Sequence, residues 1–452
     1  MATNVQRTDN TRAIAARLLA TLLQNKSSLS QLLAAQTAGL DQRDRAFVAE
    51  LCFGTLRYQP ELAGLVAQLL SKPMKKKDSD VQALLLLGAY QLRYMRVPDH
   101  AAIGETVAAT RAIGKAWAKG LINGVLRNLQ RQSRQLEDAL PQSAKLNHPD
   151  WLLEKFRSQW PAQWQDIVTA NNLAPPMTIR VNQRRHSREA YLQILDTAGI
   201  AASPCLLSGA GIQLQHPVDV GTLPGFASGS CSVQDEASQL VASLLDEPAG
   251  QGPAGPRRLL DSCCAPGGKT GHLLERNPDI VLDAIDIDAH RLLRVTQNLG
   301  RLALSANIIT GDSKQPEQWW DGELYDAILL DAPCSASGVI RRHPDIKIMR
   351  KAKDIPPLVD QQLTLLGSLW PCLKPGGKLV YTTCSIFAEE NAGVIGTFIS
   401  ATPDAEHEPI HASWGQAGDF GRQLLPKVDA HDGFYFACLH KHRQDPAGLS
   451  SS

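Results

Sequence analysis

Two cysteines fifty residues apart carry the most distinctive chemistry of this chain. Cys334 stands in the sequence DAPCS and Cys384 in TTCS, and each follows an apolar run (325–330 and 378–381) typical of a buried strand in a parallel sheet. Such sheets hold ligands at the carboxyl ends of their strands, so we expect both sulfurs to face one substrate. Cysteine is also a common small core residue. Pro333 and the polar neighbours of both thiols favour the chemical interpretation.

A glycine-containing turn, CCAPGGKT at 263–270, follows another apolar run at 257–260. Its glycines would let the backbone pass close to a ligand and open a helix toward it. A P-loop requires glycine six residues before the lysine, where Cys263 stands, and the G-x-G-x-x-G dinucleotide fingerprint is absent. The turn therefore indicates a nucleoside-type ligand without a pyrophosphate. The candidate ligand contacts are Cys263, Cys264, Ala265, Pro266, Gly267, Gly268 and Lys269.

Three acidic residues end successive predicted strands: Asp286, Asp312 and Asp331. We expect Asp286 to accept hydrogen bonds from both ribose hydroxyls of the ligand and Asp312 to contact an adenine edge. A single acid after a strand is explained equally well as a helix N-cap. Three of them at successive strand ends favour a shared ligand crevice.

The spacing of apolar residues divides the chain into three predicted domains. Residues 1–140 have helical spacing and predict an all-α domain, which a polar linker near 130–147 would follow. Residues 148–235 mix helices and short strands, as in a small α+β domain. Strands and helices alternate over 236–442, which predicts a doubly wound α/β domain. The Gly/Pro-rich segment 247–256 predicts a loop.

The net charge of +1 conceals a basic N-terminal part. Residues 1–145 contain 20 Lys and Arg against 11 Asp and Glu, a net charge of +9, and the remainder carries −8. A basic face attracts phosphates through counterion release. A solvated helix face would look similar in one helix, but the charge of the whole part favours nucleic acid. The basic residues include Lys75, Lys76, Lys77, Arg111, Lys115, Lys119, Arg127, Arg131 and Arg134.

Composition narrows the class of protein. A chain of 452 residues that is 43% hydrophobic and 20% charged suits about two to four domains with real cores. No apolar run approaches ~18 residues and the start, 1–10, is polar, so we expect a cytoplasmic protein without a membrane span or secretory signal. The nine cysteines form no CxxC pair or His/Cys cluster, so we expect neither disulfides nor a metal. We also expect a monomer.

Taken together, these motifs resemble the RNA cytosine-5 methyltransferases, which use S-adenosyl-L-methionine. The matching blocks are CAPGGKT (264–270), LDAPCSASG (330–338), YTTCS (381–385) and EEN (389–391). Four further segments are similar to the bacterial members that modify 16S ribosomal RNA and begin with a domain like the antitermination factor NusB: ELCFGTLR (50–57), KGLINGVLR (119–127), VQD (233–235) and RRHPD (341–345). Cys264 departs from the family, which usually has alanine there, a change between small residues.

The resemblance implies a fold and a substrate. It implies a NusB-like RNA-binding domain at 1–140, a small RNA-binding domain at 148–235 and a Rossmann-like methyltransferase domain at 236–442. The implied product is 5-methylcytosine in 16S ribosomal RNA, and the implied partner is that RNA, either free or in an early assembly state of the small subunit. The target base must be flipped out or single-stranded, because its ring face is attacked.

The reaction explains why two thiols are needed. Carbon 5 of cytosine is too weak a nucleophile to attack a methyl sulfonium until a thiolate has added to carbon 6. By resemblance, Cys384 is this nucleophile and Cys334 assists product release. Asp331 would recognise the polar edge of the base, and Lys269 would act where cofactor and base meet.

Other interpretations stay open. The same reaction on transfer RNA would leave the same motifs. A non-catalytic RNA-binding factor of the NusB type would explain residues 1–140 but neither Cys334, Cys384 nor the turn. An amino-group methyltransferase would have an aromatic residue where Cys334 stands.

Overall fold

The computed structural model describes residues 10–25, 28–246 and 256–443. The polar start of the chain and the predicted loop at 247–256 fall almost wholly outside this range. The chain separates into two compact units. The first contains Met1–Asn172 together with Ile340–Lys351, and the second contains Leu173–Val339 and Ala352–Ser452.

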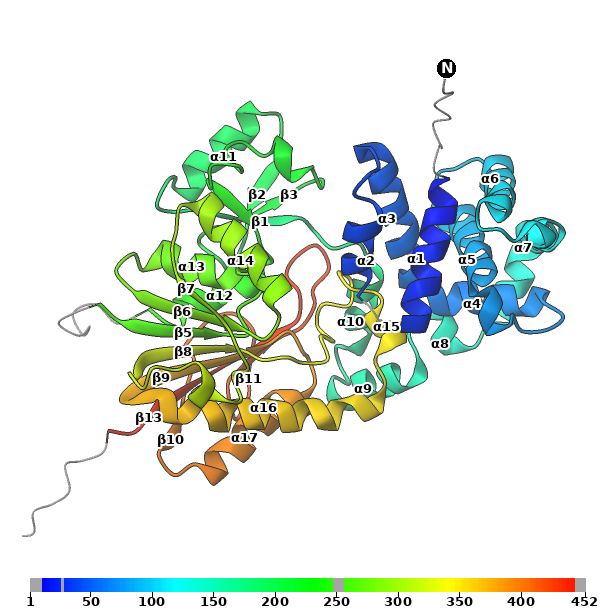
Figure 1. Ribbon diagram of the computed structural model, residues 1–452. Helices are drawn as coiled ribbons and strands as arrows, with labels where there is room; N and C mark the ends of the chain where they lie inside the picture. Colours follow the sequence, from blue (N-terminus) through cyan, green and yellow to red (C-terminus); the bar gives the residue numbers. More distant parts are fainter. Residues whose placement is uncertain (1–9, 26–27, 247–255, 444–452) are drawn as a thin grey trace, which may run out of the picture. The chain divides into compact units, whose positions relative to one another are not determined.

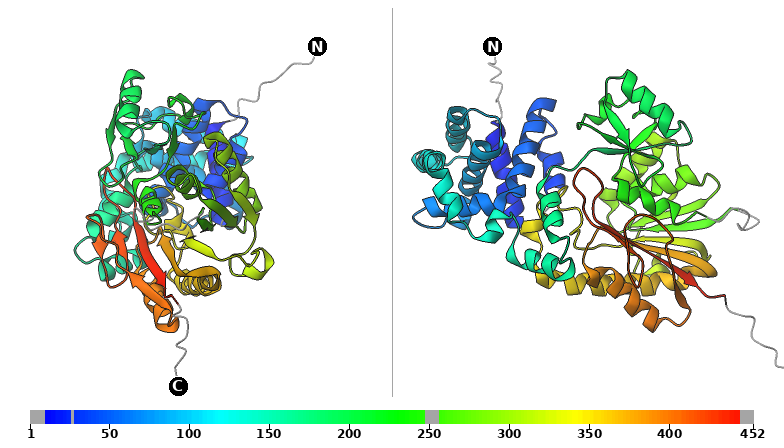
Figure 2. Two further views of the ribbon diagram at one scale, coloured as in Figure 1. Left: turned by 90° about the vertical axis from the view of Figure 1, so that its left-hand side faces the viewer. Right: turned by 180° about the vertical axis from the view of Figure 1, so that it is seen from behind.

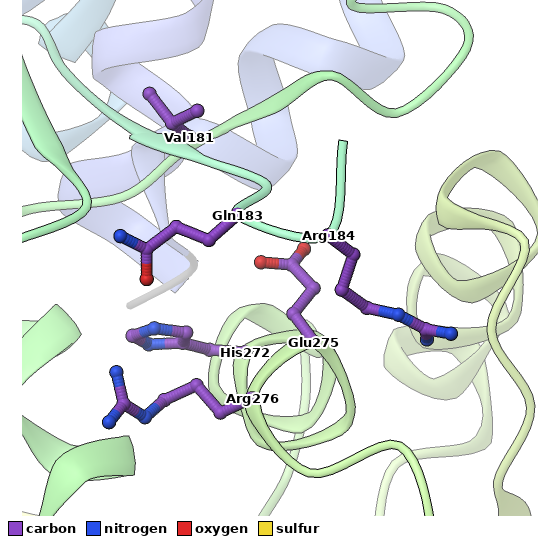
Figure 3. A pocket seen from close by; sticks show the side chains of 6 residues that line it. All are labelled: Val181, Gln183, Arg184, His272, Glu275 and Arg276. Carbon is purple, nitrogen blue, oxygen red and sulfur yellow. The ribbon is translucent and has the colours of Figure 1, made fainter. Parts of the chain in front are cut away.

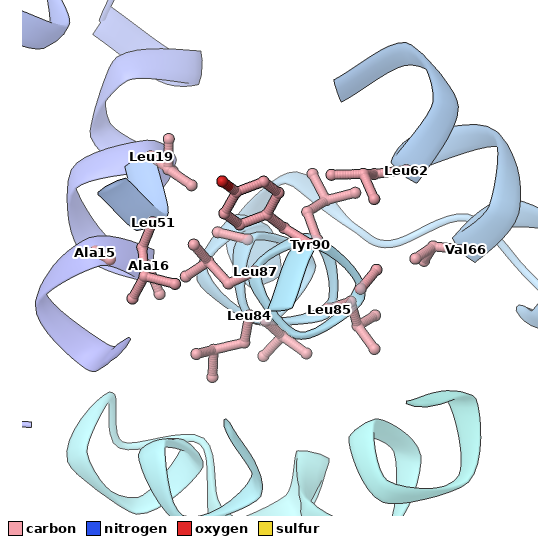
Figure 4. Packing of buried hydrophobic residues seen from close by; sticks show 14 of the residues in the cluster. Ala15, Ala16, Leu19, Leu51, Leu62, Val66, Leu84, Leu85, Leu87 and Tyr90 are labelled. Atoms are coloured by element: carbon pink, nitrogen blue, oxygen red, sulfur yellow. The ribbon is translucent and has the colours of Figure 1, made fainter. Parts of the chain in front are cut away.

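The first unit is entirely helical within the described residues, as predicted for its N-terminal part (Figure 1). Helix α5 (Ser79–Tyr94) lies at its centre and contacts α1, α3, α4, α6 and α7. Leu84, Leu85 and Leu87 of α5 are fully buried against these neighbours (Figure 4). The surrounding helices are α1 (Thr11–Asn25), α2 (Leu29–Gln36), α3 (Gln42–Arg57), α4 (Gln59–Leu69), α6 (Asp99–Ala112), α7 (Lys119–Asp138), α8 (Gln142–Lys145), α9 (Asp150–Gln159) and α10 (Trp164–Asn172).

The predicted linker at 130–147 is wrong, because helices α7 and α8 occupy most of it. Leu136, Leu140 and Ala144 are buried in the helical core, at a spacing of four residues. The polar residues between them form the exposed face of the same helices, so a polar composition did not mean a linker here.

A short segment from far along the chain belongs to the first unit. Helix α15 (Ile346–Met349) packs Ile348 and Met349 against the helical core. The Nζ atom of Lys347 donates hydrogen bonds to the backbone oxygen of Arg57 at 3.0 Å and to Oδ1 of Asn172 at 2.6 Å. This segment follows directly after the loop that contains Cys334, so the RRHPD motif contributes to the helical unit.

The second unit begins with a small antiparallel sheet in the order β2-β3-β1-β4. Its strands are β1 (Thr178–Val181), β2 (Ala202–Pro204), β3 (Gly211–Leu214) and β4 (Cys231–Val233), with helix α11 (Arg188–Thr197) packed on it. Ile179, Tyr191 and Ile212 are fully buried between helix and sheet. This is the predicted α+β part.

A larger mixed sheet follows, in the order β11-β12-β13-β9-β8-β5-β6-β7, with β10 beside β13. Strands β5 (Arg258–Ser262), β6 (Val281–Asp286), β7 (Asn307–Thr310), β8 (Tyr325–Asp331) and β9 (Leu373–Thr383) are parallel. Strands β10 (Ala405–Glu408), β12 (Arg422–Leu424) and β13 (Phe434–Lys441) pair antiparallel, as does the short β11 (Gln416–Ala417). The order reverses at β5, where β6 lies on one side and β8 on the other, and ligands bind at such a switch point.

Helices cover both faces of this sheet, which makes three layers (Figures 1 and 2). Alternate strand residues point to opposite faces. Leu259 and Leu329 pack with helices α12 (Glu236–Ser243), α13 (Gly268–Arg276) and α14 (Ala289–Leu302). Leu260 and Leu330, one residue further along the same strands, pack with α16 (Ile355–Leu369) and α17 (Ala392–Ala401). The prediction of a doubly wound α/β domain is confirmed.

No helix in the described ranges combines the length and the apolar character needed to cross a bilayer.

Lys347 provides a pH test of the buried segment. Burial, with a contribution from Arg57, lowers the pKa of Lys347 well below its usual value. Between that lowered pKa and about 10.4, the unfolded chain binds more protons than the folded one, so stability should rise with pH by up to about 1.4 kcal/mol per pH unit. Lys347→Met removes this titration. We expect the free energy of unfolding of the wild type to gain on that of the variant between pH 7 and pH 10 in urea titrations. A constant difference would mean that Lys347 titrates normally.

Candidate active site

A cavity of about 280 Å³ opens at the carboxyl ends of the parallel strands. Seven of the residues predicted from sequence line it: Cys263, Ala265, Asp286, Asp312, Asp331, Cys334 and Cys384. Cys264, Pro266, Gly267, Gly268 and Lys269 do not line it. The structure therefore brings the three strand-end acids and both cysteines of interest to one site.

The two sulfurs lie side by side. The Sγ atoms of Cys334 and Cys384 are 3.5 Å apart, because each cysteine follows one of two neighbouring parallel strands. The Cys334 side chain is buried and Cys384 is partly exposed. A hydrogen bond with Cys384, together with burial, raises the pKa of the Cys334 thiol well above its usual value. Cys334 therefore keeps its proton and can donate it in a hydrogen bond to the Cys384 sulfur.

A buried carboxylate joins the two cysteine loops. Glu390 is fully buried, and its Oε2 accepts hydrogen bonds from the hydroxyls of Ser335 at 2.5 Å and Ser385 at 2.6 Å. Its Oε1 accepts a hydrogen bond from the backbone N–H of Ser335 at 2.7 Å. Each serine directly follows one of the two cysteines, so this one side chain fixes the position of both.

The loops also meet through their backbones. Gly338 N–H donates to the Cys384 carbonyl at 2.9 Å, and the Ser337 hydroxyl accepts from Ile386 N–H at 2.9 Å. A Cβ atom on Gly338 would come within 2.3 Å of the Gly433 carbonyl. Only glycine fits at this position without displacing the backbone.

The glycine turn has a packing role as well as the ligand role predicted from the sequence. Gly267 has a φ of 91°, and a Cβ atom there would come within 3.1 Å of the Val295 backbone in α14. Cys263 adopts a φ of 60°, which is unusual for a residue with a side chain and costs on the order of 1–3 kcal/mol. Such strained positions concentrate at functional sites. The turn is thus held tightly beside the cavity.

Two of the three strand-end acids, Asp286 and Asp312, already accept hydrogen bonds from the backbone. Asp286 is buried, and its two oxygens accept from Ala265 N–H at 3.1 Å and Asp288 N–H at 3.0 Å. Asp312 accepts from Lys314 N–H at 3.0 Å. Each carboxylate oxygen has a second lone pair, so both acids can still accept hydrogen bonds from a ligand.

Lys269 reaches the site through an ion pair. Its Nζ atom lies 2.7 Å from Oδ2 of Asp331 and 5.0 Å from the centre of the Phe434 ring. The pair holds Asp331 at the rim of the cavity beside the cysteines. Lys269 thus acts on the cavity through Asp331.

The sequence interpretation missed three residues here. Asp261 is fully buried on β5, accepts from the Thr270 hydroxyl at 2.6 Å, and has an Oδ1 atom without a partner among the described residues. Burial raises the pKa of Asp261 to about 7. Arg291 and Ile287 line the cavity, and Ile287 is 68% exposed although apolar. Two of the three left a signal in the sequence: Asp261 is an acid directly after the apolar run 257–260, and Ile287 is an apolar residue directly after a strand-end acid.

Within the described residues, no group of three or more His, Cys, Asp or Glu side chains is arranged to hold a metal ion.

A parallel sheet with an antiparallel β13, a turn after β5 and a ligand cavity at the switch point define a Rossmann-like methyltransferase domain. Three family models match the chain: 16S rRNA methyltransferase RsmB/F at residues 252–440, the RsmF/B-like ferredoxin-like domain at 148–221, and the NusB family at 9–131.

Relatives that match almost the whole chain point to the same family as these models. Ribosomal RNA small subunit methyltransferase B of Pseudomonas putida is 51% identical over 96% of this chain and 98% of its own length. The protein of the same name from Vibrio cholerae is 45% identical over 96% of this chain and 98% of its own length. The chain therefore belongs to the ribosomal RNA small subunit methyltransferase B family, and the predicted family and three-part fold class are confirmed.

Solved structures show the same fold. The match with the crystal structure of PH0851 spans 95% of this chain and 99% of the PH0851 chain, with a TM-score of 0.78 at 22% identity. A methyltransferase homologue from Pyrococcus horikoshii covers 66% of this chain and 97% of its own, with a TM-score of 0.57 at 28% identity.

The positioning role of Glu390 can be tested by substitution, with the neighbouring Glu389 as the control. Glu390→Ala removes the carboxylate that accepts from two hydroxyls and one N–H, and this frees the cysteine loops. A misplacement of about 1 Å can cost 10²-fold in rate. We expect kcat for methyl transfer to fall about 100-fold, and Glu390→Gln, which keeps one acceptor oxygen, to restore most of it. The control is Glu389→Ala, which removes the same charge from an exposed position. Equal activity of Glu389→Ala and Glu390→Ala would contradict the positioning role.

Proposed function

We propose that this protein methylates carbon 5 of a cytosine in 16S ribosomal RNA through a covalent adduct with Cys384. The observation that carries this proposal is the 3.5 Å separation of the Cys334 and Cys384 sulfurs at a cavity lined by strand-end acids. A methyltransferase acting on oxygen or nitrogen needs no thiol nucleophile. Addition to a pyrimidine ring needs one, and elimination benefits from a second proton-bearing group.

The cavity fits S-adenosyl-L-methionine as the methyl donor. Its 280 Å³ lies close to the lower end of the range for small-molecule sites, about 300 to 1,000 Å³. Asp286 and Asp312 would accept hydrogen bonds from the ribose and the adenine, and exposed Ile287 would cover the apolar face of a ring. When bound, the cofactor supplies the methyl group as a sulfonium electrophile.

The residues of the chain perform the rest of the reaction. The Cys384 thiol loses its proton to solvent and its sulfur bonds to carbon 6 of the flipped base. The double bond between carbons 5 and 6 opens and leaves its electron pair available at carbon 5, which makes that carbon nucleophilic, while Asp331 holds the polar edge of the ring. After methylation, carbon 5 gives up its proton to solvent, the ring double bond reforms, and Cys384 leaves with the bonding electron pair. The Cys334 thiol, which keeps its proton, donates a hydrogen bond to the departing sulfur and speeds its release.

Ribosomal RNA is the favoured substrate over transfer RNA, because the whole-chain relatives at 51% and 45% identity bear a ribosomal RNA name. The basic N-terminal part would grip RNA without reading its sequence. The substrate would be free 16S ribosomal RNA or an early assembly intermediate in the cytoplasm, and the enzyme would act as a monomer.

The two thiols can be separated by adduct trapping. Cys334→Ala should form the covalent adduct but release it slowly, so that protein and 16S ribosomal RNA migrate together on a denaturing gel. Cys384→Ala and the double variant should give no such band, because the nucleophile is missing. A band with Cys384→Ala instead would reverse the two roles. Full activity of either single variant would make that cysteine a packing residue.

Asp286 tests the cofactor site. Asp286→Ala removes charge-assisted hydrogen bonds worth roughly 1.5 to 3 kcal/mol each, so the Kd for S-adenosyl-L-methionine should rise at least tenfold in calorimetry. Part of this loss will come from Ala265 N–H, which also loses its acceptor. Asp279→Ala, an exposed acid before the opposite end of β6, is the control and should bind normally. An unchanged Kd for Asp286→Ala would remove Asp286 from the site.

A further inference from the structure

A second cavity lies outside the site described above, within the same unit. It holds about 300 Å³ between the turn after β1 and helix α13. Gln183 and Arg184 come from the turn, and His272 and Arg276 come from the helix (Figure 3). A neighbouring cavity of about 290 Å³ shares Arg184 and is also lined by Arg185 and by residues 302–304. Arg184 therefore lies between two adjoining hollows.

The cations of this turn are free. Gln183, Arg184 and Arg185 are all exposed, and neither arginine side chain has an ion-pair or hydrogen-bond partner within the described residues. A structural arginine would have one, as Arg188 does four residues further on: its Nη1 donates to the carbonyls of Cys205 and Ser208 at 3.2 and 3.0 Å. Two adjacent unpaired guanidiniums are a ready anion site.

The cavity also contains an unpartnered polar group. His272 is only 4% exposed, and its Nδ1 atom has no hydrogen-bond partner among the described residues. Burial, aided by Arg180 and Arg276, lowers the pKa of His272 well below its usual range, so the ring is neutral at pH 7. In Figure 3 the Gln183 side chain points toward this ring. A neutral imidazole can donate a hydrogen bond to an anionic oxygen. The Gln183 Nε2 atom donates one hydrogen to the Gly209 carbonyl at 3.5 Å and keeps a second hydrogen that can do the same.

The other charges of the cavity are already neutralised. Glu275 forms a bidentate pair with buried Arg180, with N–O distances of 2.8 and 2.9 Å. Arg276 pairs with Asp246. What remains uncompensated is the positive charge of Arg184 and Arg185, so the ligand should be anionic.

We propose that the two cavities form a binding site for the sugar–phosphate backbone of the RNA substrate, with Arg184 and Arg185 contacting successive phosphates and His272 with Gln183 binding one phosphate oxygen. This proposal rests on the proposed function only in taking RNA as the ligand. A chain of phosphates fits two hollows that share one arginine better than a single ion does. The site reads no base, so it would position the strand.

The test is the salt dependence of RNA binding. Each lost phosphate contact should lower the slope of log Kd against log salt concentration by about 0.7 for single-stranded RNA. We therefore expect Arg184→Ala/Arg185→Ala to lower the slope by about 1.4 in anisotropy titrations of labelled 16S ribosomal RNA between 50 and 300 mM KCl. His272→Phe should weaken binding severalfold with the slope unchanged, because it removes a neutral donor. S-adenosyl-L-methionine binding should stay normal in both variants.

The charge-matched control is Arg294→Ala/Lys353→Ala. Both residues are exposed in the same unit and line neither cavity. Equal slopes for the two double variants would overturn the proposal. A second result would also overturn it. If the wild type and the Arg184→Ala/Arg185→Ala variant gave equal RNA slopes, and calorimetry showed that only the wild type binds inorganic phosphate, the site would take a free ion and not the RNA backbone. Because binding is measured without methylation, a protein that binds RNA here but forms no 5-methylcytosine would refute the proposed function and leave this site standing.

Discussion

The parallel pairing of β8 with β9 sets the geometry on which the active site depends. Asp331 lies opposite Thr382, and the Ala332 N–H continues the ladder to the Thr382 carbonyl at 2.9 Å. The two cysteines leave the sheet from these neighbouring ends. A slip of one residue would move one loop by about 3.3 Å along the strand and turn its side chains to the other face. The contact between the sulfurs therefore requires this register.

The same register explains how the Glu390 carboxylate can be buried with no cationic partner among the described residues. Glu390 would be costly in the interior if its charge were unpaired. The two cysteine loops supply it with two hydroxyls and a backbone N–H, and Gln362 adds a weaker donor at 3.4 Å. The loops and the carboxylate thus stabilise one another.

Strand ends and spacing predicted much of this molecule, and the misses have physical causes. Cys334, Cys384 and Asp286 were predictable because parallel strands deliver their ends to one edge. Glu390 was marked only as part of the EEN block, without a role, because its contacts depend on a 3-10 turn, Ala388–Glu390, that folds back onto both loops. Asp261 directly follows the apolar run 257–260, but the sequence does not show that its side chain is fully buried on β5. Only the three-dimensional packing leaves its Oδ1 atom without a partner among the described residues.

The segment Ile340–Lys351 has a consequence for how the chain is made. The main part of the helical unit ends at Asn172 in the sequence, yet the buried hydrogen bond to the Arg57 carbonyl comes from Lys347. During synthesis at about 5 to 20 residues per second, residue 351 follows residue 172 by roughly 10 to 40 s. The first unit to leave the ribosome must therefore wait, incompletely packed, until the loop of Cys334 has been translated. The contacts of Lys347 therefore form only while the second unit is being synthesised, so the first unit completes its packing late.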